Sequence, residues 1–252
     1  MKKSIAVFII SSYFFSWVVW LPLVLNYNSS LDLPTFPFQH FLGAFGPLFG
    51  LLMTRMYSND VDLQKIYNPK LAIRNWVLAF SPVILFFIIL PLYFVTSEVS
   101  LQGLGLTDQI SSDNIFLIMF IWIFTYGLGE ESGWRGFLFP SLEKDFPTLK
   151  SIALTAIIWA IWHLPMFFYH ENFRSMGLGI IGWIVGIFAG SLILAWLTKK
   201  SKYSVLPAII WHGTFNFFTA SSYGDGFVAG AMSGIVIIIS IVLPRLRSDD
   251  FR

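Results

Sequence analysis

Long apolar stretches without charge dominate this chain. Eight stretches contain no Asp, Glu, Lys or Arg, and they span 4–31, 33–54, 75–97, 114–129, 151–170, 175–198, 203–224 and 226–244. A helix needs about 20 apolar residues to cross the hydrocarbon core of a bilayer, and all but the fourth stretch reach or nearly reach that length. These stretches are apolar on every face, and backbone exposed to lipid must satisfy its own hydrogen bonds, which favours helices. The pattern predicts an all-α membrane protein with about eight transmembrane helices, in one transmembrane domain over 1–252.

The fourth stretch differs from the others because charged residues follow its apolar part directly. Glu130, Glu131 and Arg135 come next, and an apolar run then resumes. A helix over 114–139 would be about 39 Å long at roughly 1.5 Å per residue. It would place two carboxylates and one guanidinium near one end of a membrane span.

Composition supports the membrane assignment and excludes several classes of protein. Charged residues make up 12% of the chain and hydrophobic residues 56%, whereas about 25% of an ordinary soluble domain is charged. This excludes soluble globular, disordered and nucleic-acid-binding proteins. The net charge of +2 is typical of lysines and arginines facing the cytoplasm, so we expect no nucleic-acid partner. The absence of cysteine excludes disulfides, thiolate metal ligands and cysteine nucleophiles.

The basic residues fall on one side of an eight-helix topology. Eight crossings place both termini on the same side, and all of the 16 basic residues except Arg174 lie on that side. Lysine and arginine are enriched in cytoplasmic loops, and adding or removing one helix would scramble this arrangement. We therefore predict two cytoplasmic termini and a multi-pass protein of the cell membrane. The compact chain favours a bacterial plasma membrane.

The first polar cluster inside the predicted spans contains Glu130, Glu131 and Arg135. Polar groups in a bilayer are costly and point to function. Glu131 and Arg135 are four residues apart, so they share a helix face and can pair. Glu130 points about 100° away as a free carboxylate in a site of low polarity, the setting that general acid–base chemistry requires. The alternative is a cytoplasmic helix end with solvated charges.

Two further clusters lie on other predicted helices. His163 follows Trp159 by one helical turn, and its alternative role is that of a hydrogen-bonded core histidine. His212 and Asn216 project to one side of the seventh predicted span, where both could donate hydrogen bonds to a developing oxyanion. The alternative for this pair is hydrogen bonding between helices, a common use of His and Asn in membranes.

The predicted depths bring these clusters together. At about 1.5 Å per residue in a hydrocarbon core of about 30 Å, four groups lie between the cytoplasmic face and a level just past the midplane: Glu130, His163, His212 and Asn216. Three helices therefore contribute polar groups to one half of the membrane. This predicts an intramembrane site open to the cytoplasm. His40 and His170 lie at predicted outer helix ends, where interfacial roles are expected.

The three motifs together resemble the CPBP family, which comprises CAAX-type intramembrane endopeptidases and bacteriocin-immunity proteins. The motifs are Glu-Glu-x-x-x-Arg, an aromatic-x-x-x-His that ends within Trp-His-Leu-Pro, and His-x-x-x-Asn. The resemblance covers a motif-bearing core at about 114–220, whereas earlier segments match only in hydropathy. One departure is Trp159, where the family commonly has Phe, and this change is conservative.

The resemblance implies a role for each motif residue. Glu130 is expected to be the general base that activates water, with assistance from His163. His212 and Asn216 are expected to stabilise the oxyanion of the tetrahedral intermediate. Glu131 and Arg135 are expected to hold the helix in place. The implied substrate is a membrane-associated or lipid-modified peptide, cleaved near the cytoplasmic leaflet.

Three alternatives to a metal-free protease stay open. Two histidines and a carboxylate are a zinc pattern, so Glu130, His163 and His212 are the candidate zinc ligands. They lack the spacing of His-Glu-x-x-His on one helix, which favours metal-free glutamate catalysis without a cofactor. A non-catalytic immunity or peptide-interaction protein would keep the same fold. A transporter or proton relay would also place Glu and His in the membrane, although no clear inverted repeat is present.

Overall fold

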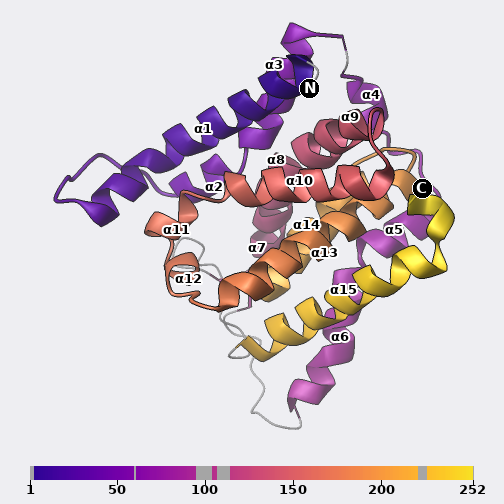
Figure 1. The fold of residues 1–252 in the computed structure, drawn as a ribbon. Helices are drawn as coiled ribbons and strands as arrows, with labels where there is room; N and C mark the ends of the chain where they lie inside the picture. The colour runs from indigo at the N-terminus through magenta and orange to yellow at the C-terminus, as the bar shows by residue number, and fades with distance from the viewer. Residues whose placement is uncertain (1–2, 60, 95–103, 107–113, 221–225, 252) are drawn as a thin grey trace.

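The computed structural model describes residues 3–59, 61–94, 104–106, 114–220 and 226–251, and every regular element in these ranges is helical (Figure 1). Each of the eight uncharged stretches coincides at least in part with a helix. The all-α prediction is therefore confirmed. Lys2 and Arg252, two of the basic residues used to predict the topology, lie outside the described residues.

Five helical segments are long and apolar enough to cross a membrane. They are α1 (Lys3–Asn28), the continuous segment Ile115–Glu143, α10 with α11 (Thr148–Tyr169), α13 (Gly179–Lys200) and α15 (Phe227–Leu246). Helices α5 (Ile73–Ala79) and α6 (Ser81–Phe94) form a sixth if the pair, which bends by 48°, counts as one span. The structure thus supports five or six spans in a multi-pass membrane protein. The count of eight and the cytoplasmic termini stay predictions.

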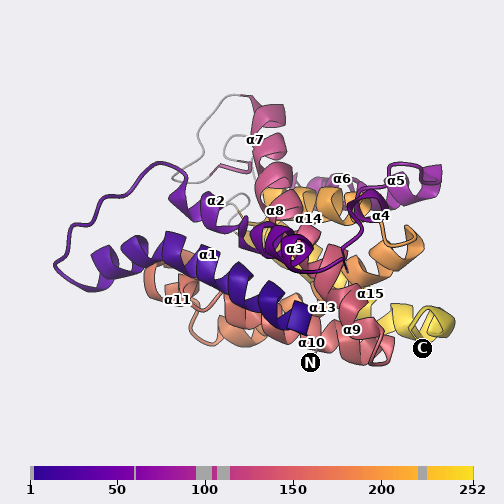
Figure 2. The ribbon, with the colours of Figure 1, turned by 90° about the horizontal axis from the view of Figure 1, so that it is seen from above.

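Two of the expected spans form helices shorter than a bilayer crossing. Helix α3 (Gly46–Tyr57) has 12 residues, and α14 (Leu206–Thr219) has 14. Helix α14 is surrounded by protein, because it packs against α5, α6, α7 (Ile115–Trp122), α8 (Gly129–Gly133), α13 and α15 (Figure 2). Its length is therefore not governed by the thickness of the hydrocarbon core. The remaining short helices are α2 (Gln39–Gly43), α4 (Leu63–Ile66), α11 (Met166–Tyr169) and α12 (Glu171–Arg174).

The fourth expected helix is present and extends to Glu143, but two π-helical segments interrupt it. Its parts are α7 (Ile115–Trp122), η1 (Ile123–Leu128), α8 (Gly129–Gly133), η2 (Trp134–Leu138) and α9 (Phe139–Glu143). The wider π turns bond residue i to i+5 and often occur at functional sites. They flank α8, the short segment that contains Glu130 and Glu131. The regular 100° step used to orient side chains from the sequence therefore does not hold along the whole segment.

Glycines allow close packing on both sides of this interrupted helix. A Cβ atom on Gly133 of α8 would lie 2.4 Å from the Pro47 carbonyl oxygen of α3. A Cβ atom on Gly213 of α14 would lie 2.3 Å from the Ile123 Cα of η1. Side chains at these two positions would force the helices apart. Glycine thus brings α14, with its polar residues, next to the helix that contains Glu130.

Several helix ends that bear basic residues meet at one side of the bundle. The Asn75 side chain near the start of α5 donates to the Lys200 carbonyl oxygen at the end of α13, over 2.9 Å. Lys199 donates to the Thr148 hydroxyl at the start of α10, also over 2.9 Å. Lys200 pairs with Asp250 of η4 (Ser248–Phe251), which follows α15. These contacts bring the start of α5, the start of α10, the end of α13 and η4 together, and the predicted sidedness of the basic residues stays a prediction.

Candidate active site

Glu130 lies inside the bundle rather than at a solvated helix end. It is only 1% exposed, and its Oε2 atom accepts a hydrogen bond from the Trp159 indole nitrogen over 2.6 Å. The expectation of a carboxylate without a partner is therefore wrong. The donor comes from α10, a separate helix whose rotation toward α8 the sequence does not define. The alternative of solvated charges fails for the same residue, because its burial excludes solvent.

Glu131 links its own helix to α14. Its Oε1 atom accepts a hydrogen bond from Arg135 Nη1 over 2.9 Å, as the four-residue spacing predicts, and both side chains are fully buried. The same oxygen lies 2.8 Å from His212 Nδ1, an ion-pair distance without the angles of a hydrogen bond. Glu131 thus contacts two motifs, whereas the sequence suggested a role only within its own helix.

His212 is held between Glu131 and Asn216. Its Nε2 atom lies 3.2 Å from the Asn216 side-chain nitrogen, so the two residues face each other across one turn of α14, as expected. A proton on Nδ1 faces the Glu131 carboxylate, and Nε2 then accepts from the Asn216 amide. Both ring nitrogens of His212 therefore have neighbours in this arrangement.

His163 lies at a break in its span, not inside a regular helix. Helix α10 ends at Trp162, His163 is its C-cap, and α11 begins at Met166. Pro165 explains the break, because proline lacks an N–H and disfavours helical geometry in the residue before it. His163 Nδ1 lies 2.8 Å from the Trp159 carbonyl oxygen, which fixes the ring beside the other motif residues.

Trp159 is the common neighbour of the three motifs. Beyond its hydrogen bond to Glu130, its ring lies under the Arg135 guanidinium, at 4.5 Å from the ring centroid. Its ring also makes an edge contact with His212 at 5.4 Å and a tilted contact with His163 at 5.8 Å between centroids. From the sequence, we expect this side chain to have only a supporting role, as for Glu131 and Arg135. The signal that could have identified it is its indole N–H, a hydrogen-bond donor one helical turn before His163.

The proposed zinc ligands do not fit a zinc ion as these side chains are arranged. Glu130 binds the Trp159 indole, His163 Nδ1 faces a carbonyl oxygen, and both nitrogens of His212 have neighbours. Within the described ranges, no three His, Asp or Glu side chains are grouped so that they could hold a metal ion. We therefore derive no chemical step through a metal.

A second polar cluster joins three separate elements around His40, and the sequence did not predict it. His40 of α2 is buried. Its two ring nitrogens lie 2.7 Å from the Tyr169 hydroxyl and 2.9 Å from the Tyr126 hydroxyl. These contacts connect α2, α11 and η1. Our expectation of an interfacial role for His40 overlooked the two tyrosines, which lie far from it in sequence and satisfy its ring inside the bundle.

Comparison with known proteins identifies relatives of the segment that contains the motifs. Residues 112–218 match the family described as type II CAAX prenyl endopeptidase Rce1-like, and this range includes all three motifs. A segment of 93 residues is 31% identical to CAAX prenyl protease 2 of Methanococcus maripaludis. That segment is 34% of this chain and 34% of the relative, so the match spans about a third of either protein.

Proposed function

We propose that this chain, which belongs to the Rce1-like CAAX protease family through residues 112–218, is an intramembrane endopeptidase. The observation that supports this most strongly is the burial of Glu130 among groups from three helices. Its helix contributes two carboxylates, α10 contributes Trp159 and His163, and α14 contributes His212 and Asn216. Buried ionisable groups in a membrane are costly, and a functional site is the usual reason for keeping them.

Glu130 is the proposed general base. One carboxylate oxygen is held by the Trp159 indole, which orients the group. Glu130 takes a proton from water, the water oxygen attacks the carbonyl carbon of the scissile peptide bond, and a tetrahedral oxyanion forms. When the C–N bond breaks, the leaving amine receives the proton that Glu130 took from water, and the other product is a carboxylic acid. His163 assists in moving the proton.

His212 and Asn216 are the proposed stabilisers of the oxyanion. For this role the contact between Asn216 and His212 must open, so that the Asn216 amide and the N–H of a doubly protonated His212 ring both donate to the oxyanion. Donors aimed at a developing oxyanion are among the largest contributions to catalysis. Glu131 lies beside His212 Nδ1 and favours a proton there, as the carboxylate does in a Ser-His-Asp triad. Glu131 and Arg135 are thus proposed to position the catalytic groups.

The proposed substrate is a lipid-modified or otherwise membrane-associated peptide. The methanococcal relative is named CAAX prenyl protease 2. In this chain Glu130 and His163 lie on segments long and apolar enough to cross a membrane, and the shorter α14, which contains His212 and Asn216, packs among such segments. A substrate anchored in the bilayer would reach such a site from the membrane. The location proposed for the protein is a bacterial plasma membrane, with the peptide bond cleaved near the cytoplasmic leaflet.

The test uses purified protein and a farnesylated peptide ending in a CAAX sequence, with a fluorophore and a quencher on opposite sides of the scissile bond. Glu130→Gln should lower the initial rate by about 10²–10⁴-fold, the usual contribution of a general base. The matched control is Glu171→Gln, which removes an exposed carboxylate of α12 and should keep the wild-type rate. Thermal unfolding of all three proteins checks that each is folded.

Each outcome of this test has a distinct meaning. A full rate for Glu130→Gln would exclude Glu130 as the base. If the peptide is not cleaved, membrane peptides from cells with wild-type and Glu130→Gln protein are compared by mass spectrometry. Absence of any difference would contradict the protease function and favour an immunity or transport role. A chelator should leave the rate unchanged, whereas loss of activity with recovery on adding Zn²⁺ would establish the zinc alternative.

A further inference from the structure

A pocket of about 310 Å³ lies at the end of the bundle where α5, α13 and the end of α15 meet. Its lining consists of Arg74, Asn75, Leu78, Trp196, Lys200 and Arg247. None of these residues belongs to the candidate active site. Three of the six are cations, and they come from three segments that are far apart in the sequence.

The positive charge of this pocket is only partly neutralised. Lys200 pairs with Asp250 over 2.7 Å, and Asp250 also accepts a hydrogen bond from Trp196 over 3.1 Å. Arg74 and Arg247 form no ion pair with a described residue. Three cations therefore face one carboxylate, and the excess charge favours an anion.

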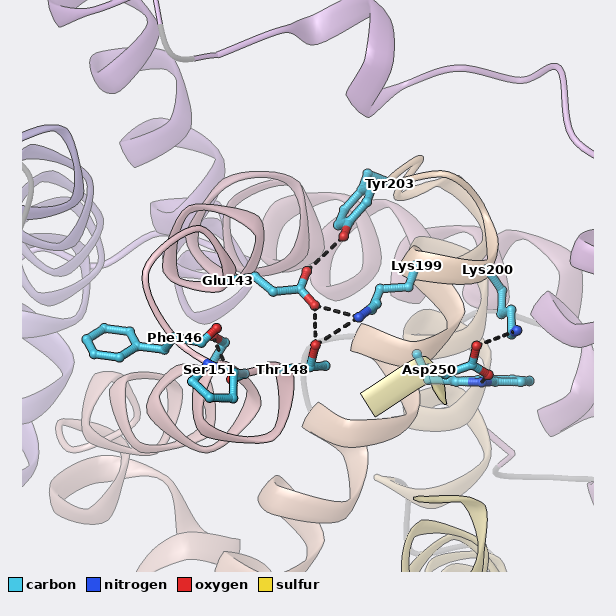
Figure 3. Close-up of polar contacts among 10 residues, drawn as sticks. Glu143, Phe146, Thr148, Ser151, Lys199, Lys200, Tyr203 and Asp250 are labelled. Atoms are coloured by element: carbon cyan, nitrogen blue, oxygen red, sulfur yellow. Dashed lines mark hydrogen bonds and ion pairs between the residues drawn. The ribbon is translucent and has the colours of Figure 1, made fainter. Parts of the chain in front are cut away.

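Neighbouring contacts separate Lys199 from this pocket and place Lys200 and Arg74 beside it. Lys199 turns to a separate cluster, where Glu143 accepts hydrogen bonds from Lys199 over 2.6 Å and from Tyr203 over 2.9 Å. Figure 3 shows Lys199 and Lys200 diverging toward different carboxylates. Asn75, which is 3% exposed, donates to the Lys200 carbonyl oxygen and to the Ser201 hydroxyl. This bond holds the start of α5, and with it Arg74, beside the end of α13.

The pocket combines cations with an apolar wall. Leu78 and Trp196 supply that wall, and the aliphatic stems of the arginines and of Lys200 extend it. The pocket lies where membrane-crossing helices end, a level at which tryptophan is enriched and where basic pockets between helices bind lipid headgroups. A free phosphate ion would need the cations alone, whereas a phospholipid would also use the apolar wall.

We propose that this pocket binds the phosphate headgroup of an anionic phospholipid from the leaflet at this end of the bundle. The phosphate contacts Arg74, Arg247 and Lys200, and the adjoining glycerol and acyl chain lie along Leu78 and Trp196. The bound lipid would join α5, α13 and the end of α15. The proposal is independent of the proposed protease function, because it involves none of the same residues and no reaction.

The test measures binding of phosphatidylglycerol to the purified full-length protein in neutral detergent, by native mass spectrometry and by thermal unfolding. Phosphatidylcholine and inorganic phosphate are the comparison ligands. Phosphatidylglycerol should bind and raise the unfolding temperature, and the other two should not. Arg74→Gln with Arg247→Gln should weaken binding roughly fivefold per lost cation, about 25-fold in all, since each cation near an anionic lipid contributes about 1 kcal/mol.

Three further variants separate this site from general surface charge. Lys70→Gln with Lys144→Gln removes two exposed cations from outside the pocket and should leave binding unchanged. Arg74→Lys with Arg247→Lys keeps the charge and should bind nearly as well as wild type. Asp250→Asn frees Lys200 and should strengthen binding, a change that misfolding would not produce. Equal losses in the two charge-removing pairs, or equal binding of inorganic phosphate, would overturn the proposal.

Discussion

The candidate active site and the basic pocket use the same kind of ion pair in opposite surroundings. Arg135 and Glu131 lie 2.9 Å apart with both side chains 0% exposed, whereas Lys200 and Asp250 lie 2.7 Å apart with side chains 34% and 22% exposed. The distances are nearly equal, so distance does not distinguish the pairs. Removing one partner of a buried pair leaves a costly charge behind. Removing one partner of an exposed pair leaves a charge that water solvates.

The two regions also differ in the balance of charge. In the active site each carboxylate contacts a side chain from another helix, Glu130 through a hydrogen bond from Trp159 and Glu131 through an ion-pair contact with His212, so the contacts link the helices. In the pocket, cations outnumber carboxylates, so the region retains an attraction for a ligand. Two ion pairs of nearly equal length can therefore have different roles: one lies among contacts that hold helices together, and the other lies beside a site that attracts an anion.

The largest expected difference between the two regions is the loss of unfolding free energy when one partner of the ion pair is removed. Arg135→Ala leaves the Glu131 carboxylate buried, and breaking such a pair costs about 3–5 kcal/mol of unfolding free energy. Lys200→Ala breaks the exposed pair and should cost no more than about 1 kcal/mol. Unfolding of both variants in mixed micelles of increasing denaturing detergent measures the two losses. Equal losses would mean that burial does not separate the pairs.

Replacing Trp159 should have an intermediate effect, and this effect should be a lower catalytic rate. Trp159→Phe keeps an aromatic ring but removes the hydrogen bond to Glu130, and a bond to a charged group is worth about 1.5–3 kcal/mol. We expect kcat on the quenched peptide to fall by about tenfold or more, with little change in KM.

Trp17→Phe is the matched control for this prediction. It also removes an indole hydrogen bond, here to the Trp162 carbonyl oxygen over 3.0 Å, away from Glu130. If Trp159 positions Glu130, only the Trp159 variant changes kcat, even where both variants lose some stability. An equal kcat in the two variants would mean that Trp159 contributes to packing and does not position Glu130.

Replacing Asp250 should have the smallest effect on stability, and this effect should depend on pH in a defined way. The hydrogen bond from Lys200 lowers the pKa of Asp250 below its ordinary value. A lowered pKa contributes stability above the unfolded value of about 3.9 and loses it as the pH falls through the folded value. In lipid-free detergent, Asp250→Asn should cost about 1 kcal/mol or less at pH 7. The difference in stability from wild type should shrink below about pH 4. Unfolding measurements at pH 7 and below about pH 4 test this. A difference that stays constant would contradict the pairing of Asp250 with Lys200.

Much of the fold follows from residue patterns. The uncharged stretches locate the helices, and the four-residue spacings of Glu131 with Arg135 and of His212 with Asn216 give contacts that the structure contains. Such local pairs are predictable because helix geometry places residues three or four apart on one face. The π-helical segments and the break at His163 were missed, since both alter the regular turn on which those patterns depend.

Contacts between helices could not be predicted in the same way. The Trp159 hydrogen bond to Glu130 and the contact of Glu131 with His212 depend on how α10 and α14 rotate against α8. An apolar sequence is compatible with many rotations, because every face of such a helix can meet lipid or another helix equally well. The glycines at positions 133 and 213 set the close approach, but their partners become evident only in the folded chain.

The residue sequence alone determines the membrane class, the helical fold and the three polar motifs, because these depend on composition and on short spacings along the chain. The folded protein adds the partner of each carboxylate. It shows that Glu130 meets an indole and Glu131 a histidine, and that three distant cations line one pocket. These contacts arise from close packing among helices, where each side chain's surroundings depend on residues from several distant segments at once.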